Sequence, residues 1–369
     1  MPDLRQLTRA YLREVRAMSF TDLQARQQPP WSSFPFGGPG IAWALWRSRT
    51  QPRTDRMRNA EAWLTAAAST ARQRLAFHHR ERPGPDLGCS LYYAGDGIAL
   101  LQLLIAHDHP TRRAFEARLP RFLARCRRKR GGPTELLQGT AGYLAATTLL
   151  YARTREPRAL AVADVLGRDL LERGVRRRDS WLRAPRLGLG HGRAGTFFAL
   201  LGWAGAAGRE LPGWLFRGLA RLADDVERGG RLGAPSQMAG PVMQRSWCSG
   251  AAGLSLLWAR AYEHTGAPVY LTHARAMASQ LTDHTWAAGN LCCGLGGRSY
   301  ALLAMDRVDP DRGWFSHAEQ LAVRAAEMML TAPGGWPNGL YYGYPGLVCL
   351  ADDLARPRGA RLGFPLVEG

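Results

Sequence analysis

The stretch LCCGLGG at residues 291–297 follows the same pattern as an earlier stretch, RSWCSGAAG at residues 245–253. In both, a cysteine lies two residues before a Gly-x-x-Gly turn, and a run of apolar residues with helical character follows. Glycine permits tight turns and a close approach of the backbone. A thiol at such a turn lies beside the N-terminus of a helix, where the positive end of the dipole lowers a thiol's pKa. The pattern therefore places reactive thiols at the start of two helices.

The thiols at these turns are candidate metal ligands. Cys248, Cys292 and Cys293 could supply three thiolates to one zinc ion and leave its fourth tetrahedral position open, as in a catalytic site. Cysteine is also among the most buried residue types, so the alternative is that Cys248 fills the core and the adjacent pair is accidental. Adjacent cysteines can also form a strained vicinal disulfide, which a reducing compartment disfavours.

The turn is part of an internal repeat. A small-x-x-Gly turn followed by an apolar run recurs seven times, and successive closing glycines lie 44 to 58 residues apart. This period is the size of one helical hairpin plus a loop and is typical of repeat architectures. The turns lie at residues 37–40, 94–97, 139–142, 192–195, 250–253, 294–297 and 343–346.

Each repeat unit predicts two helices of different character. Residues 142–151 are almost wholly apolar and suit a helix buried on all sides, whereas residues 159–173 are amphipathic. The same order recurs in 98–105 with 112–127, 196–207 with 214–227, 254–262 with 270–284, and 300–305 with 316–330. Two further amphipathic segments, 4–18 and 57–77, complete a predicted set of seven inner and seven outer helices. Such hairpins can stack as an open solenoid or a ring, and seven apolar inner helices favour the ring because it leaves no apolar end to cap.

Three motifs together resemble the lanthionine synthetase C-like (LanC-like) family, the lanthipeptide cyclases. They are GHGRAG at residues 190–195, WCSGAAG at 247–253 and CCGLGG at 292–297. The resemblance covers nearly the whole chain and implies an all-α fold, an α,α-toroid of seven inner and seven outer helices, with residues 1–369 forming one domain. All the turns would then gather at one end of the inner barrel. The family usually has Cys-His-Gly where this chain has Cys292-Cys293-Gly294, and a three-cysteine version occurs among some relatives.

The resemblance implies a zinc-dependent lanthionine cyclase. One Zn²⁺ per chain, bound by Cys248, Cys292 and Cys293, would deprotonate a peptide cysteine, which adds to dehydroalanine or dehydrobutyrine to form a thioether ring. The enolate that results needs a proton. His191 is the candidate general acid, because it lies on a glycine-framed turn and histidine titrates near neutral pH. A histidine in a helical protein is otherwise more often a surface residue or a satisfied core residue.

Two further catalytic residues are expected where the chain departs from the family pattern. The family places an acid four residues before the repeat glycine, and Glu135 stands there in place of the usual Asp. Its alternative role is a charge at a helix N-terminus. The family's arginine before the Trp-Cys pair corresponds most nearly to Arg245, which is displaced by one position, with Gln244 at the expected place. Ser249 stands where relatives often have Tyr. These departures affect the expected acid–base details more than the metal site.

The chain has a formal net charge of +19, and its basic residues are arginines apart from Lys129. This charge predicts an acidic or extended anionic partner. Nucleic acid is not expected, because the arginines are spread over the predicted outer helices and no base-stacking aromatic module is visible. The N-terminus has no apolar signal core, and prolines interrupt the longest uncharged stretch, residues 328–351. The sequence therefore predicts a cytoplasmic protein without a membrane span.

The expected substrate is a dehydrated precursor peptide with a leader, which requires a separate dehydratase. Two alternatives remain open from the sequence. One is a zinc enzyme of the same fold that adds a small thiol such as glutathione to dehydrated residues. The other is a toroid that only binds peptides and whose zinc is structural.

Overall fold

The computed structural model describes residues 4–49, 52–73, 75–77, 90–176, 180–229, 244–283, 288–331, 338–356, 363–365 and 367. Over these residues the regular structure consists of α-helices and two short 3-10 helices, with no β-strand. The all-α fold predicted from the sequence is confirmed. None of the helices in this part of the chain is long and apolar enough to span a membrane.

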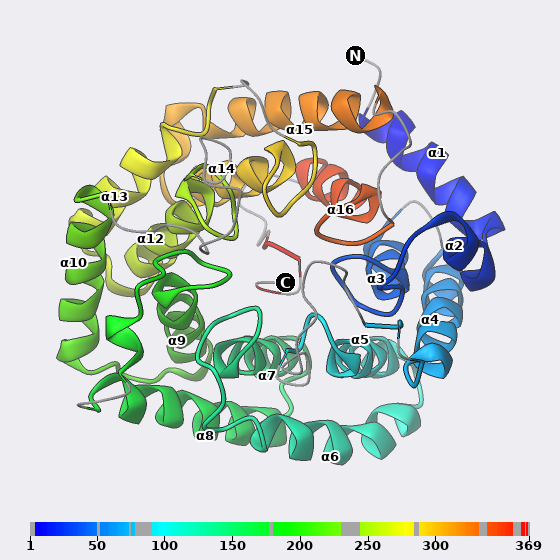
Figure 1. Ribbon diagram of the computed structural model, residues 1–369, viewed down its shortest axis with the longest axis horizontal. Coiled ribbons are helices and arrows are strands. Elements are labelled where there is room, and N and C mark those ends of the chain that lie inside the picture. The colour runs from blue at the N-terminus through cyan, green and yellow to red at the C-terminus, as the bar shows by residue number, and fades with distance from the viewer. Residues whose placement is uncertain are drawn as a thin grey trace.

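Seven inner helices form a closed ring within the described part of the chain (Figure 1). Each begins at one of the seven predicted turns and packs against the inner helices before and after it, and the last packs against the first. Every residue of the first is buried, as its unbroken apolar run predicts. The inner helices are α3 (Gly38–Arg47), α5 (Gly95–Asp108), α7 (Thr140–Thr154), α9 (Arg193–Ala207), α12 (Ala251–Thr265), α14 (Leu295–Val308) and α16 (Tyr344–Leu354).

Amphipathic helices form an outer ring around the inner one (Figure 1). Six of them pack on the inner helix that precedes them in the chain, and α1 packs on α16. Helix α6 shows the pattern, because Phe115, Leu119 and Phe122 are buried at helical spacing. The outer helices are α1 (Leu4–Ala17), α4 (Arg53–Thr70), α6 (Arg113–Arg127), α8 (Pro157–Gly174), α10 (Gly213–Glu227), α13 (Pro268–Ala278) and α15 (Trp314–Thr331). The predicted toroid of seven inner and seven outer helices is therefore present in the described residues.

The structure adds a helix that the sequence pattern does not indicate, α2 (Phe20–Arg26). The Ser19 side chain accepts a hydrogen bond from the Asp22 backbone N–H, and the Asp22 carboxylate accepts one from the Ser19 N–H. This capping box supports a helix that is too short to show a periodic apolar face. The predicted segment 57–77 corresponds to α4. This helix begins earlier, at Arg53, because Pro52 stands directly before it as the N-cap residue.

The glycines that close the turns are required by close backbone contacts. A β-carbon on Gly253 would lie 2.1 Å from the Trp247 carbonyl oxygen, and one on Gly297 would lie 2.0 Å from the Leu291 carbonyl oxygen. Both distances are far below van der Waals contact, so a larger residue would force the turn open. This contact explains why the small-x-x-Gly pattern recurs at the start of the inner helices.

Hydrogen bonds join each turn to the next all the way around the ring. Six of the seven links use a backbone N–H, and the link from the second turn to the third uses the Ser90 hydroxyl instead. The seven turns are therefore joined into one continuous ring of hydrogen bonds, which we call the backbone collar. In ring order the links are Phe34 N to Tyr92 O (3.1 Å), Ser90 Oγ to Leu137 O (2.5 Å), Leu137 N to Gly190 O (3.0 Å), Gly190 N to Cys248 O (2.7 Å), Cys248 N to Cys292 O (3.3 Å), Cys292 N to Tyr341 O (3.0 Å) and Leu340 N to Phe34 O (2.9 Å).

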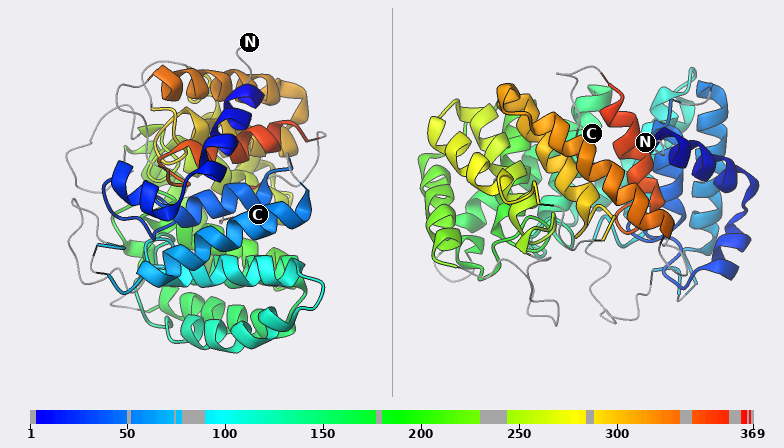
Figure 2. Two further views of the ribbon diagram at one scale, coloured as in Figure 1. Left: turned by 90° about the vertical axis from the view of Figure 1, so that its right-hand side faces the viewer. Right: turned by 90° about the horizontal axis from the view of Figure 1, so that it is seen from above.

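A buried ion pair joins α3 to α16 at their C-terminal ends, away from the turns. Arg47 Nη2 on α3 lies 2.8 Å from Asp353 Oδ1 on α16, and the two side chains are 5% and 0% exposed. The Tyr300 hydroxyl on α14 donates to the other Asp353 oxygen at 2.9 Å. In Figure 2, α1 in blue lies beside α15 and α16 in orange and red.

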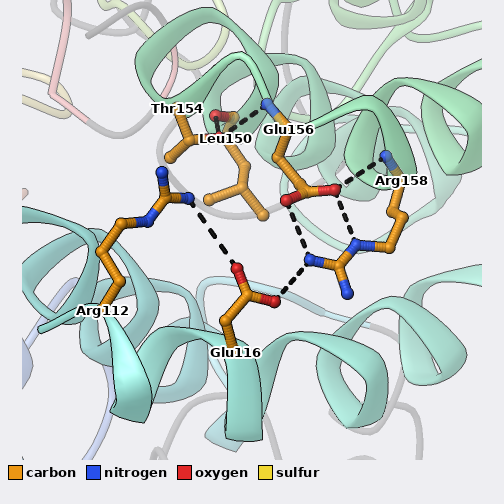
Figure 3. A network of polar contacts seen from close by, with 6 residues as sticks. All are labelled: Arg112, Glu116, Leu150, Thr154, Glu156 and Arg158. Atoms are coloured by element: carbon orange, nitrogen blue, oxygen red, sulfur yellow. Dashed lines mark hydrogen bonds and ion pairs between the residues drawn. The ribbon is translucent and has the colours of Figure 1, made fainter.

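Charged contacts also link the outer ring (Figure 3). The Arg158 guanidinium at the start of α8 lies 2.6 Å from Glu156 Oε1 and 2.6 Å from Glu116 Oε2 on α6. Arg112 approaches the other Glu116 oxygen at 4.0 Å. The Arg158 and Glu116 side chains are about half exposed, so this network contributes to the register of two outer helices more than to stability.

The described residues 363–365 and 367 lie inside the ring and are drawn in red in Figure 1. Phe364 is 1% exposed and stacks on Trp247, with ring centroids 4.2 Å apart and an angle of 1° between the planes. Its edge also contacts the Tyr300 ring at 5.5 Å. The Tyr341 hydroxyl donates to the Pro365 carbonyl at 3.2 Å. The segment therefore packs against Trp247, the residue before Cys248 in the turn.

Candidate functional site

The candidate site lies at the turn end of the toroid, where four inner helices begin. Cys248 precedes α12, Cys292 and Cys293 precede α14, His191 precedes α9, and Glu135 precedes α7. The backbone links from Gly190 to Cys248 and from Cys248 to Cys292 hold three of these turns edge to edge. Residues about 50 positions apart in the sequence are thus adjacent, because consecutive repeats lie side by side in the ring.

The three cysteines form one hydrogen-bonded group. The thiols of Cys248 and Cys293 each hydrogen-bond to the thiol of Cys292, and all three cysteines are free of disulfides. The hydrogen bond with Cys292 lowers the pKa of Cys248 to about 6, against the opposing effect of burial. It also lowers the pKa of Cys293, while the same contacts raise the pKa of Cys292 well above its usual range. The outer two thiols thus favour the thiolate form and the middle one keeps its proton.

Polar side chains of the same turns surround the thiols. The Ser249 hydroxyl donates to Cys248 Sγ at 3.5 Å, and the Ser246 hydroxyl lies 3.7 Å from the same sulfur. Asn290 Oδ1 accepts the backbone N–H of Cys293 at 3.0 Å and lies 3.7 Å from its thiol. These contacts fix the turn backbone and hold the sulfurs in place.

His191 and Glu135 lie side by side. His191 Nδ1 lies 3.4 Å from Glu135 Oε2, and their side chains are 9% and 18% exposed. The positive charge of His191, when protonated, acts on Cys248 and favours its thiolate. Both residues line a pocket of about 240 Å³ whose wall includes Pro133 and Trp181. The imidazole is therefore anchored on one side by a carboxylate and faces a partly apolar cavity near the thiols.

Arg245, the third expected catalytic residue, pairs with an acid from the loop before α14. Its Nη1 donates to Asp283 Oδ2 at 3.0 Å, and its side chain is 28% exposed. Its charge acts on Arg298, a buried residue in the first turns of α14. Arg245 thus lies on the Cys293 side of the site, next to a second arginine that sequence reasoning did not select.

The residues present fit a bound zinc ion in their chemistry. Three sulfur donors from two adjacent turns are a typical ligand set for zinc, and the lowered pKa of Cys248 and Cys293 favours the thiolate form that zinc binds. Arg298 adds two buried nitrogens without an acceptor in the described residues, which suits an anionic metal–thiolate group nearby. In the described part of the chain, no group of three His, Cys, Asp or Glu side chains is spaced to hold a metal ion, so the fit rests on the chemistry of the donors.

The fold and the site define a closed helical toroid with a thiol-rich centre at its turn end. The family model for "Lanthionine synthetase C-like protein" matches residues 34–367, so the chain belongs to the lanthionine synthetase C-like family. Among solved structures, nisin cyclase is similar in fold, with a TM-score of 0.66 and 14% sequence identity over 95% of this chain and 92% of that chain. No curated protein sequence gives a significant match.

An aromatic group at the site was not predicted from the sequence. The Tyr342 hydroxyl hydrogen-bonds to the Cys292 thiol, and burial is the main reason that the pKa of Tyr342 is raised. Phe36 stacks on Tyr342 at 4.4 Å and approaches Tyr93 at 6.3 Å. Aligning the turns would have found them, because Phe36, Tyr93, His191, Cys293 and Tyr342 each stand directly before the first small residue of a turn.

Proposed function

We propose that this protein is a zinc-dependent lanthipeptide cyclase, which adds cysteine thiols of a dehydrated precursor peptide to dehydroalanine or dehydrobutyrine. The observation that carries the proposal is the meeting of Cys248, Cys292, Cys293 and His191 at one end of the ring. Membership of the LanC-like family and the likeness in fold to a protein named nisin cyclase support it.

Cys248, Cys292 and Cys293 would hold one Zn²⁺ per chain. When bound, zinc supplies the charge that keeps a substrate thiol deprotonated at neutral pH. The protein's own contribution is to present three sulfurs from turns that the backbone collar fixes. Cys292 would lose its proton on metal binding, and Asn290 and Ser249 would keep the neighbouring sulfurs in position.

His191 would supply the proton that completes the reaction. The sulfur of the peptide cysteine forms a bond to the β-carbon of the dehydrated residue, and the electrons of the C=C bond move toward the carbonyl as an enolate. The α-carbon then takes a proton, and a protonated imidazole at the pocket wall can donate it. Glu135 Oε2, 3.4 Å from the imidazole Nδ1, would hold the imidazole in place. Arg245 would add positive charge to the site from the Cys293 side, with Asp283 as its partner.

The surface around the site suits an extended peptide. The pocket beside His191 has Pro133 and Trp181 in its wall, and Phe36, Tyr93 and Tyr342 lie near the thiols. Such apolar walls can bind side chains that flank a dehydrated residue. A net charge of +19 would attract an acidic leader. Dehydration would come from a separate dehydratase, and the free thiols fit a reducing compartment such as the cytoplasm.

Cyclisation of synthetic peptides tests the proposal. Peptides that contain dehydroalanine and a cysteine, with and without an acidic leader, are incubated with zinc-loaded protein and then treated with an alkylating agent. Ring closure leaves the peptide mass unchanged and removes the alkylated product in mass spectrometry. His191→Ala should keep the fold and the zinc but slow this loss about a hundredfold or more. Protein that binds the peptides but leaves every thiol free would contradict cyclase activity and favour a peptide-binding role. Adducts of added glutathione would instead support addition of a small thiol.

A further inference from the structure

Arg298 is a buried cation with little compensation. It is 0% exposed, although arginine is rarely buried unless it is paired. Its Nη1 donates to the Asp283 carbonyl oxygen at 3.3 Å. Its Nε and Nη2 have no hydrogen-bond acceptor in the described part of the chain. A group buried in this way normally costs several kcal/mol unless an opposite charge lies nearby.

The charge of Asp283 acts on Arg298, but this carboxylate is shared with a second arginine. The Asp283 carboxylate is 42% exposed and binds Arg245 at 3.0 Å, so it serves another guanidinium. Burial, and then the positive charge of Arg245, lower the pKa of Arg298 to about 10. Residues 284–287, which lie outside the described residues, contain no Asp or Glu. Two arginines and one carboxylate therefore leave an excess of positive charge at the Cys293 side of the site.

The cysteine group is the remaining source of negative charge. Arg298 begins the second turn of α14, its backbone N–H donates to the Gly294 carbonyl, and Cys293 lies directly before Gly294. Arg298 and Cys293 are also close enough for their charges to interact. Three thiolates around one divalent cation carry a net charge of about −1. Protonated thiols would give the positive charge of Arg298 no counter-charge, whereas the metal-loaded group would supply one.

We infer that Arg298 is the internal counter-ion of the metal-loaded cysteine group, a positioning residue that stabilises zinc binding from behind the ligands. The inference rests on the proposed zinc site. Because the side chain is fully buried, it acts on the ligands and not on the substrate. The excess charge would also offset the second negative charge that arrives with a substrate thiolate.

Zinc affinity tests the inference without any measurement of catalysis. Metal-free protein is titrated with zinc in competition with a chromophoric chelator at one fixed pH, and unfolding of the metal-free protein is measured in parallel. Arg298→Met removes the charge and keeps much of the length, and Arg298→Lys keeps the charge. We expect Arg298→Met to weaken zinc binding about tenfold to a hundredfold, the range typical of residues that support metal ligands. Arg298→Lys should bind zinc almost as tightly as the wild type.

The metal-free protein should respond in the opposite direction. Arg298→Met removes an unbalanced buried charge, so metal-free protein should be as stable as the wild type or more stable. Arg193 is the matched control, because it is also buried near the start of an inner helix but is paired with Asp225 at 2.5 Å. Arg193→Met should therefore destabilise the protein and leave zinc affinity unchanged.

Two results would overturn the inference. Arg298→Met that binds zinc like the wild type but lowers the stability of the metal-free protein would show a purely structural role. Wild-type protein that binds no zinc would refute the proposed metal site and the inference with it. If the wild type binds zinc and Arg298→Met, but not Arg193→Met, binds it more weakly, the proposed metal site and the inference are both supported.

Discussion

Removing the charge of Asp353 should loosen the closure of the ring. Asp353→Asn removes the carboxylate charge that pairs with the buried Arg47 and with Arg356 and takes one carboxylate oxygen from a site that also accepts from Tyr300. Breaking a buried ion pair by removing one partner costs about 3–5 kcal/mol. The asparagine oxygen can retain one of the two hydrogen bonds, so we expect the free energy of unfolding to fall by about 3 kcal/mol.

Urea unfolding followed by circular dichroism measures this loss. The control is Glu327→Gln, because Glu327 pairs with Arg324 at 3.0 Å on the outer ring and both side chains are more than a third exposed. That pair should contribute about 0.5 kcal/mol or less. The double variant Arg47→Met with Asp353→Leu should lose less stability than Asp353→Asn, because the buried Arg47 charge is removed together with its partner and only the partly exposed Arg356 loses an ion pair.

Equal losses in Asp353→Asn and Glu327→Gln would refute this reasoning. The ring would then be closed by the apolar packing of α3 against α16, and the buried pair would contribute no more than a surface contact. A double variant less stable than Asp353→Asn would show instead that the polar network is worth more than hydrophobic replacements at the same positions.

Three further outcomes are expected. Glu135→Gln should retain zinc but slow peptide cyclisation about tenfold or more, because a neutral amide stabilises a charged imidazole less well; an unchanged rate would remove Glu135 from the mechanism. Cys293→Ala should lower the zinc content of purified protein from about one ion per chain, measured by elemental analysis, and an unchanged content would exclude the three-cysteine ligand set. Phe364→Ala should lower the free energy of unfolding by about 3–5 kcal/mol and change the fluorescence of Trp247, whereas Phe364→Leu should lose much less. An equally large loss in Phe364→Leu would show that the aromatic stack on Trp247, and not the apolar volume of the side chain, stabilises this segment.

Several features of the toroid follow from the sequence because they are local and repeated. The closing glycines must lie against a carbonyl group six residues earlier, as at Gly253 and Gly297, so the turns can be recognised by spacing. The apolar run after each turn identifies an inner helix. The amphipathic run that follows the end of that helix identifies an outer helix. The pairing of His191 with Glu135 also follows from the repeat, because both stand at the starts of consecutive inner helices.

Other features depend on contacts between distant parts of the chain, for which a single sequence carries no local signal. Arg47 and Asp353 lie 306 residues apart and meet only when the ring closes. Arg245 is adjacent to the Trp-Cys pair in sequence, but its partner Asp283 comes from the loop before the next inner helix. Arg298 reads as an ordinary helix residue, and its burial beside the thiols depends on how α14 packs in the ring. Local hydrogen bonding and periodic burial determine the helices, whereas the charges around the thiols are determined by which turns the closed ring brings together.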